Sequence, residues 1–134
     1  MGVIDGTYQL VKNDKYVELL TKQGVPEEQA KQADSLKSTL RVKVDGKKIV
    51  LNIDDTVRKV ENVLVVGETV EEKVFGDAVG LSTTTLEGNT VKVRSVDKEG
   101  KATAIDRTYN FSESGLEVVI ETKAQKCTRS YKRI

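Results

Sequence analysis

The residues best suited to binding chemistry are two arginines, each followed two positions later by a tyrosine. Arg129 precedes Tyr131 near the end of the sequence, and Arg107 precedes Tyr109 earlier in the chain. A guanidinium can hold a carboxylate through two parallel N–H bonds, and a phenol can donate a third. Residues two apart share one face of a β-strand. In strands, each Arg-x-Tyr pair could therefore bind an acidic group.

Alternation along these segments leaves open which way the arginines point. Arg129 shares a face with Cys127 and Tyr131, opposite a more polar set of residues. Arg107 shares its face with the apolar Ile105. An arginine inside a protein is unfavourable unless it is paired or hydrated. Both arginines could equally lie outside and pair with surface carboxylates, so two interpretations remain at this point.

The composition excludes several classes of function. The 134 residues contain no histidine and a single cysteine, which excludes His/Cys zinc sites, Ser-His-Asp triads and Cys-His pairs. We expect no cofactor. A formal net charge of +1 gives no basic surface for nucleic acid. One cysteine allows no internal disulfide, and Asp5 and Gly6 interrupt any apolar run at the start, so we expect a cytoplasmic location.

The elements that must position these side chains are mostly short strands. Alternating runs separated by turn residues predict ten of them. They cover about residues 7–11, 40–44, 49–53, 58–66, 69–75, 80–87, 90–97, 102–110, 116–123 and 126–133. Such a meander favours a closed, antiparallel up-and-down barrel, which has no sheet edges. A barrel of more than about eight strands is too wide for its side chains to fill easily, so we expect an internal cavity.

One interval, between the first two strands, has a helical pattern. Residues 15–23 follow Asn13 and Asp14, either of which could be the N-cap, and Gly24 is placed to end this helix. A second helix begins at Pro26, a favourable first-turn residue. The predicted fold is therefore all-β, a ten-stranded barrel capped by a helix-turn-helix, in one domain over residues 1–134.

Several motifs occur in the order and spacing of a known family. Gly6-Thr7-Tyr8-Gln9-Leu10 lies near the start and Cys127-Thr128-Arg129-Ser130-Tyr131-Lys132 near the end. Between them come the helix pair, the hairpin signal Asp45-Gly46, then Val66-Gly67-Glu68 and Leu86-Glu87-Gly88-Asn89. Together they resemble the intracellular fatty-acid-binding proteins, which include the cellular retinoid-binding and bile-acid-binding proteins. The resemblance covers nearly the whole chain.

The resemblance implies a carrier that holds a long-chain fatty acid inside the barrel, with the carboxylate near the two Arg-x-Tyr pairs. The candidate ligand-binding residues are Arg107, Arg129, Tyr131, Tyr109, Tyr16, Val118 and Ile120. In the family, turns flank the entrance to the cavity, and here Val57, Arg58 and Phe75 occupy them. An inward arginine is then tolerable, because water hydrates it when the cavity is empty and an anion neutralises it when filled.

Other functions stay open beside this expectation. A bulkier ligand, such as a retinoid or a bile acid, would suit a cavity left roomy by small aliphatic residues. These residues are Ile53, Val57, Val60, Val91 and Val93. A structural or protein-interaction barrel would instead need side chains to fill the interior, and an aromatic content of 4% argues against that. An enzyme is the least supported class, because no acid–base constellation of known spacing is present.

Several residues also have simpler interpretations. Tyr16 can contact a ligand or pack with its helical neighbours as a lid over the barrel. Lys15, Lys22 and Lys31 could bring that lid into transient contact with an anionic membrane, although a solvated charged face is the simpler explanation. Glu72 could organise internal water. We expect a monomer with no nucleic-acid partner.

Overall fold

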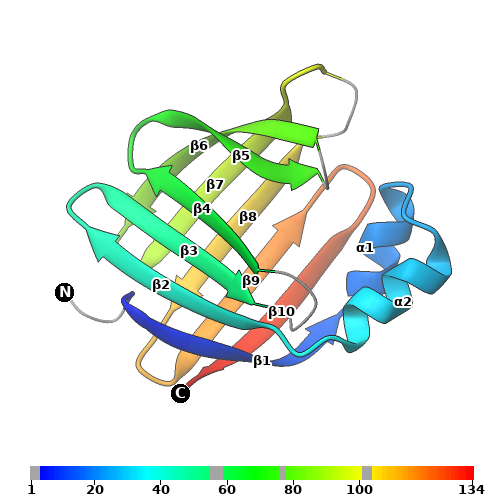
Figure 1. Ribbon diagram of the computed structural model, residues 1–134, viewed down its shortest axis with the longest axis horizontal. Helices are drawn as coiled ribbons and strands as arrows, with labels where there is room; N and C mark the ends of the chain where they lie inside the picture. The colour runs from blue at the N-terminus through cyan, green and yellow to red at the C-terminus, as the bar shows by residue number, and fades with distance from the viewer. Residues whose placement is uncertain (1–3, 55–58, 76–77, 101–103) are drawn as a thin grey trace.

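The structure is a barrel of ten strands with two helices at one end (Figure 1). The computed structural model describes residues 4–54, 59–75, 78–100 and 104–134, and the side chains of all of these except 73–75 and 78. The strands are β1 (Gly6–Asp14), β2 (Thr39–Asp45), β3 (Lys48–Asp54), β4 (Lys59–Val65), β5 (Thr69–Phe75), β6 (Ala78–Glu87), β7 (Thr90–Asp97), β8 (Ile105–Phe111), β9 (Gly115–Glu121) and β10 (Lys126–Arg133). The helices are α1 (Tyr16–Lys22) and α2 (Glu27–Ser35), both between β1 and β2. Each predicted strand and helix is confirmed.

Most strands that follow one another in the chain are neighbours in the sheet. The order is β4-β3-β2-β1-β10-β9-β8-β7-β6-β5, and all these pairs are antiparallel. The pair β1–β10 brings together the first and last strands, so the meander curls back on itself (Figure 1). The predicted antiparallel up-and-down barrel is confirmed.

The barrel is nearly closed, and the hydrogen-bonded ladder stops short of the full closure that the meander predicted. The edge strands β4 and β5 are adjacent, but they form no ladder with each other in the described part of the chain. An isolated bridge joins Val66 to Thr84, where the Gly67 amide donates to the Thr84 carbonyl at 2.8 Å. Turn signals in a sequence show where strands end but not whether the two outermost strands pair.

Buried side chains follow the alternation expected for strands with one face turned inwards. In β2, for example, exposed Arg41 lies between buried Leu40 and Val42. The buried apolar residues form one cluster on the inner face. They are Tyr8, Leu40, Val42, Ile49, Leu51, Leu64, Val91, Val93, Tyr109, Phe111, Leu116 and Val118. The inner wall is therefore largely apolar.

The turn before β9 is shorter than the sequence predicted, because β9 already begins at Gly115. Gly115 is buried and pairs with Lys132 of β10. A Cβ atom at Gly115 would collide with the backbone carbonyl oxygen of Tyr131. Only glycine lets β9 approach β10 this closely, so Gly115 serves the packing of the two strands.

The two ends of the described chain are fastened by Arg133, which the sequence analysis did not single out. Its guanidinium donates to the Asp5 carbonyl at 2.8 Å, to the Tyr8 hydroxyl at 2.8 Å and to the Ser112 carbonyl at 3.2 Å. It also lies 4.8 Å from the centre of the Tyr8 ring. Arg133 therefore links β10, β1 and the turn between β8 and β9.

The helices differ from the prediction at the first N-cap. Asn13 and Asp14 both belong to β1, and the N-cap of α1 is Lys15, with φ 65° and no side-chain capping bond. The predicted cap at Asn13 is wrong because its side chain bonds to Asp34 and Arg129 instead. Neither helix in the described residues is long and apolar enough to cross a membrane.

Candidate functional site

Arg129 lies on the same side of β10 as the buried Cys127, on the inner face of the barrel. Its Nε donates to Asn13 Oδ1 at 2.9 Å, and its guanidinium lies 4.3 Å from the centre of the Tyr16 ring. Tyr131 follows on the same face, with its ring centre 5.8 Å from the guanidinium. Arg129, Tyr16 and Tyr131 each keep some accessible surface. The Nη atoms of Arg129 contact no carboxylate among the described residues, so the charge is uncompensated there.

Arg107, by contrast, is already paired. Its Nη2 donates to Glu72 Oε1, and the side chains of Arg107 and Glu72 are only 11% and 0% exposed. The Ser82 hydroxyl donates to the same Oε1 atom at 2.6 Å, and Ser82 and Ser95 are hydrogen-bonded at 2.7 Å. Arg107 Nη1 donates to the Tyr109 hydroxyl at 2.9 Å. Of these two arginines, Arg107 is neutralised and Arg129 has no carboxylate partner among the described residues.

The surroundings of Arg107, Tyr131 and Cys127 shift the pKa of each side chain. Burial acts to lower the pKa of Arg107, but the neighbouring Tyr109 and Glu72 outweigh burial and raise it above its ordinary value. Burial raises the pKa of the Tyr131 phenol to about 12, against the attraction of Arg129. Burial also raises the pKa of Cys127 to about 11. At neutral pH, Arg107 is charged, Tyr131 is a hydrogen-bond donor and Cys127 is an unreactive thiol.

The raised pKa of Tyr131 predicts a loss of stability at alkaline pH. The phenol keeps its proton to a higher pH in the folded protein than in the unfolded chain, whose tyrosines titrate near 10.0. The stabilisation is therefore complete below pH 10 and is lost as the pH rises towards 12. We expect urea unfolding at pH 9, 10 and 11 to show a steeper fall for the wild type than for Tyr131→Phe. Parallel curves for the two proteins would contradict this.

The other candidate residues divide between the core and undescribed positions. Val118 and Tyr109 belong to the buried cluster, and Ile120 packs against it. Of the predicted entrance, Val57 and Arg58 lie outside the described residues. Phe75 ends β5, and its side chain is not among those described.

The structure also adds residues that the sequence analysis did not connect to the site. Asn13 of β1 accepts a hydrogen bond from Arg129, and Asp34 of α2 accepts one from Asn13. Glu72, considered for internal water, is the partner of Arg107. The one sequence signal for Glu72 was its place in β5 two residues after Val70, which packs against the buried cluster. No cluster of three or more Asp, Glu, Cys or His side chains in the described ranges could hold a metal ion.

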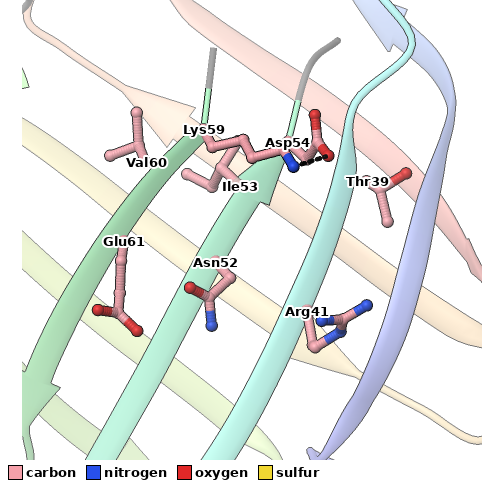
Figure 2. A pocket seen from close by; sticks show the side chains of 8 residues that line it. All are labelled: Thr39, Arg41, Asn52, Ile53, Asp54, Lys59, Val60 and Glu61. Carbon is pink, nitrogen blue, oxygen red and sulfur yellow. Dashed lines mark ion pairs between the residues drawn. The ribbon is translucent and has the colours of Figure 1, made fainter.

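Two hollows lie beside β4. The first is a groove of about 410 Å³. Arg41, Asn52 and Glu61 lie in a row across it, on β2, β3 and β4 (Figure 2). Lys59 and Asp54 form an ion pair at 4.0 Å beside them. A cleft of about 460 Å³ is lined by residues of both unpaired edge strands, β4 and β5. The groove consists mainly of polar side chains from the outer face, which distinguishes it from the inner-face site.

Comparison with known proteins shows the family of the chain. No family model matches it. A fatty acid-binding protein from Tyrophagus putrescentiae is 31% identical over 133 residues, which span 99% of each chain. The chain belongs to the fatty-acid-binding protein family. The resemblance in the sequence motifs is thereby confirmed.

Solved structures show that this fatty-acid-binding protein shares its fold with proteins of low sequence identity. Caenorhabditis elegans lipid binding protein 8 has a TM-score of 0.90 and 19% identity, covering 100% of this chain and 97% of its own. Echinococcus granulosus fatty-acid-binding protein 1 has a TM-score of 0.87 and 19% identity, covering 100% and 99%. A Schistosoma mansoni fatty acid binding protein in complex with arachidonic acid has a TM-score of 0.89 and 16% identity, covering 100% and 98%.

Proposed function

We propose that this fatty-acid-binding protein carries a long-chain fatty acid inside its barrel, with the carboxylate bound by Arg129 and Tyr131. The observation that carries the proposal is the difference between the two inner-face arginines. Arg107 is compensated by Glu72, whereas Arg129 makes no ion pair within the described residues and lies beside the Tyr131 donor. An uncompensated guanidinium with a neighbouring phenol matches the needs of a carboxylate. Arg107 and Tyr109, which are hydrogen-bonded to each other, are the second candidates to contact the headgroup.

The energies divide the work between tail and headgroup. Burying an alkyl chain contributes about 0.8 kcal/mol per CH₂, so a sixteen-carbon tail contributes roughly 10 kcal/mol before opposing terms. A charge-assisted hydrogen bond nets about 1.5–3 kcal/mol. The apolar inner wall therefore supplies most of the affinity. Arg129 and Tyr131 set the orientation of the ligand and the preference for an acid.

The proposal makes the protein a carrier and not an enzyme. The thiol of Cys127 is buried with a raised pKa of about 11, so it is no nucleophile. The carboxylate of Glu72 is held in an ion pair. Two relatives support a fatty acid as cargo: the Tyrophagus putrescentiae protein by its name, and the Schistosoma mansoni protein by its complex with arachidonic acid. We propose that a monomer performs this role in the cytoplasm.

A displacement assay tests the proposed cargo. Oleic acid, oleyl alcohol, methyl oleate, retinol and a bile acid would each compete against a fluorescent fatty acid bound to the purified protein. We expect oleic acid to bind about ten- to hundredfold more tightly than the alcohol or the ester, because only the acid forms charge-assisted bonds. Equal affinities for acid and alcohol, or stronger displacement by retinol or the bile acid, would contradict the proposal. Native mass spectrometry of gently purified protein would identify any lipid that co-purifies.

A further inference from the structure

We propose that Asn13 is a positioning residue for Arg129, holding its guanidinium through a neutral amide so that its charge stays available to the ligand. The inference rests on the proposed function, because it takes Arg129 as the headgroup site. Arg129 Nε donates to Asn13 Oδ1 at 2.9 Å. Asn13 Nδ2 in turn donates to Asp34 Oδ1 at 3.2 Å and to the Asp34 carbonyl at 3.4 Å.

The chemistry of the three side chains fixes the direction of the hydrogen bonds that link Arg129, Asn13 and Asp34. Arg129 can only donate hydrogen bonds, and the ionised Asp34 side chain can only accept them. The Asn13 amide can do both, so it must turn its oxygen towards Arg129 and its nitrogen towards Asp34. Asp34 near the end of α2 thereby fixes the orientation of an amide on β1. That amide in turn fixes a guanidinium on β10, 116 positions along the chain.

The contact also selects which edge of the guanidinium faces the ligand. A guanidinium offers five N–H donors in a rigid fork. Because Nε is taken by Asn13, the two Nη groups form the edge that remains for a bidentate carboxylate. The Tyr16 ring covers one face of the plane at 4.3 Å. Arg129 is therefore oriented on two sides by groups that carry no negative charge.

Arg107 shows what happens when a carboxylate contacts an inner-face arginine directly. Glu72 touches Arg107 without any spacer and compensates its charge inside the barrel. At Arg129 the corresponding carboxylate, Asp34, stands one amide further away. The neutral Asn13 side chain is thus the difference between a compensated arginine and one that can still attract an anion. Asn13 is in this sense a determinant of acid selectivity.

The variant Asn13→Asp tests the inference with almost no change of shape. It places a carboxylate directly against Arg129 Nε, so the guanidinium is compensated before a ligand arrives. We expect the affinity for oleic acid to fall about five- to tenfold, because the charge-assisted bond to the ligand is weakened. The affinity for oleyl alcohol should change less than about twofold, because the alcohol carries no charge. A purely structural role would weaken the binding of both ligands alike.

Two further proteins separate charge from structure. The new carboxylate in Asn13→Asp would face Asp34, and this repulsion could loosen α2. The double variant Asn13→Asp/Asp34→Asn restores a donor at position 34, so its urea unfolding midpoint should return to the wild-type value while its affinity for oleic acid stays low. Asn52→Asp, on the outer face in the groove of Figure 2, adds the same charge away from Arg129 and should leave both affinities unchanged.

The possible results distinguish a failure of the inference about Asn13 from a failure of the proposed function. If the wild type prefers oleic acid to oleyl alcohol and the double variant keeps that full preference, the role of Asn13 is overturned and the proposed function stands. If Asn13→Asp and the double variant lose acid and alcohol in equal measure, the positioning role is again overturned. If the wild type shows no preference for the acid, the proposed function fails, and the inference fails with it. An acid-selective loss in both variants, with none in Asn52→Asp, supports the assignment.

Discussion

Replacing Arg129 with methionine is expected to weaken the binding of a long-chain fatty acid by about ten- to hundredfold. Methionine keeps much of the side-chain volume and removes the guanidinium, so the loss reflects the charge-assisted bonds to the carboxylate. The tail contacts on the apolar inner wall remain, and binding should be weakened without being abolished. Displacement of a fluorescent fatty acid by oleic acid measures the effect. The affinity for oleyl alcohol should stay within about threefold of the wild type.

The control for this variant is Arg41→Met. Arg41 is exposed on the outer face of β2 and lines the groove of Figure 2. Its replacement removes the same charge from the protein and should leave both affinities unchanged. An unchanged affinity for oleic acid in Arg129→Met would show that the headgroup lies elsewhere, with the Tyr109 and Arg107 region as the next place to test.

Replacing Arg107 with methionine is expected to lower the free energy of unfolding by about 3–5 kcal/mol. The variant leaves the Glu72 carboxylate inside the barrel without its cation, and the Glu72 side chain is 0% exposed. Ser82 alone would remain as a hydrogen-bond donor to Glu72 Oε1. Urea unfolding followed by circular dichroism measures the loss. The double variant Arg107→Met/Glu72→Leu removes both charges and should recover most of the lost stability.

An ion pair on the outer face supplies the matched control. Arg94 and Asp106 are 2.8 Å apart on neighbouring strands, with side chains 61% and 50% exposed. Arg94→Met should lower the free energy of unfolding by less than about 1 kcal/mol, because exposed ion pairs contribute little. If Arg107→Met were no more destabilising than Arg94→Met, the prediction would be contradicted. The buried ion pair between Arg107 and Glu72 would then not be required for the stability of the fold.

The strands were predictable from the sequence because their signals are local. The hairpin signal Asp45-Gly46 lies where β2 ends, and Gly46 and Lys47 form the turn into β3. The alternation in β10 correctly grouped Arg129 with Cys127. Partners from distant parts of the chain were not predictable. Whether Arg107 could lie inside depended on Glu72, which is 35 positions away and reaches it only through the curvature of the barrel. Periodicity reports which face a residue occupies and says nothing of what lies opposite.

The same limit explains the wrong N-cap. Asn13 is of a residue type that is common at N-caps and lies close before the helix, so local rules favour that role. In the structure its amide bonds to Arg129, 116 positions away, and Lys15 takes the cap in a left-handed conformation. A tertiary contact here overrides a local preference. The lack of a ladder between the described residues of β4 and β5 escaped prediction for a related reason, since pairing between these strands depends on the whole circumference of the barrel.

The pairing of the first strand, β1, with the last strand, β10, forms a seam in the barrel. This seam has a consequence for the order in which the binding site forms during folding. Most other strand pairs join neighbours in sequence, whereas the Arg133–Tyr8 contact spans 125 positions. The entropy lost in closing a loop grows with its length, and topologies with distant pairings fold more slowly. Hairpins such as β2–β3 can form from local contacts alone. The Arg129–Asn13 contact belongs to the seam, so a partly folded chain has no headgroup site until its first and last strands have met.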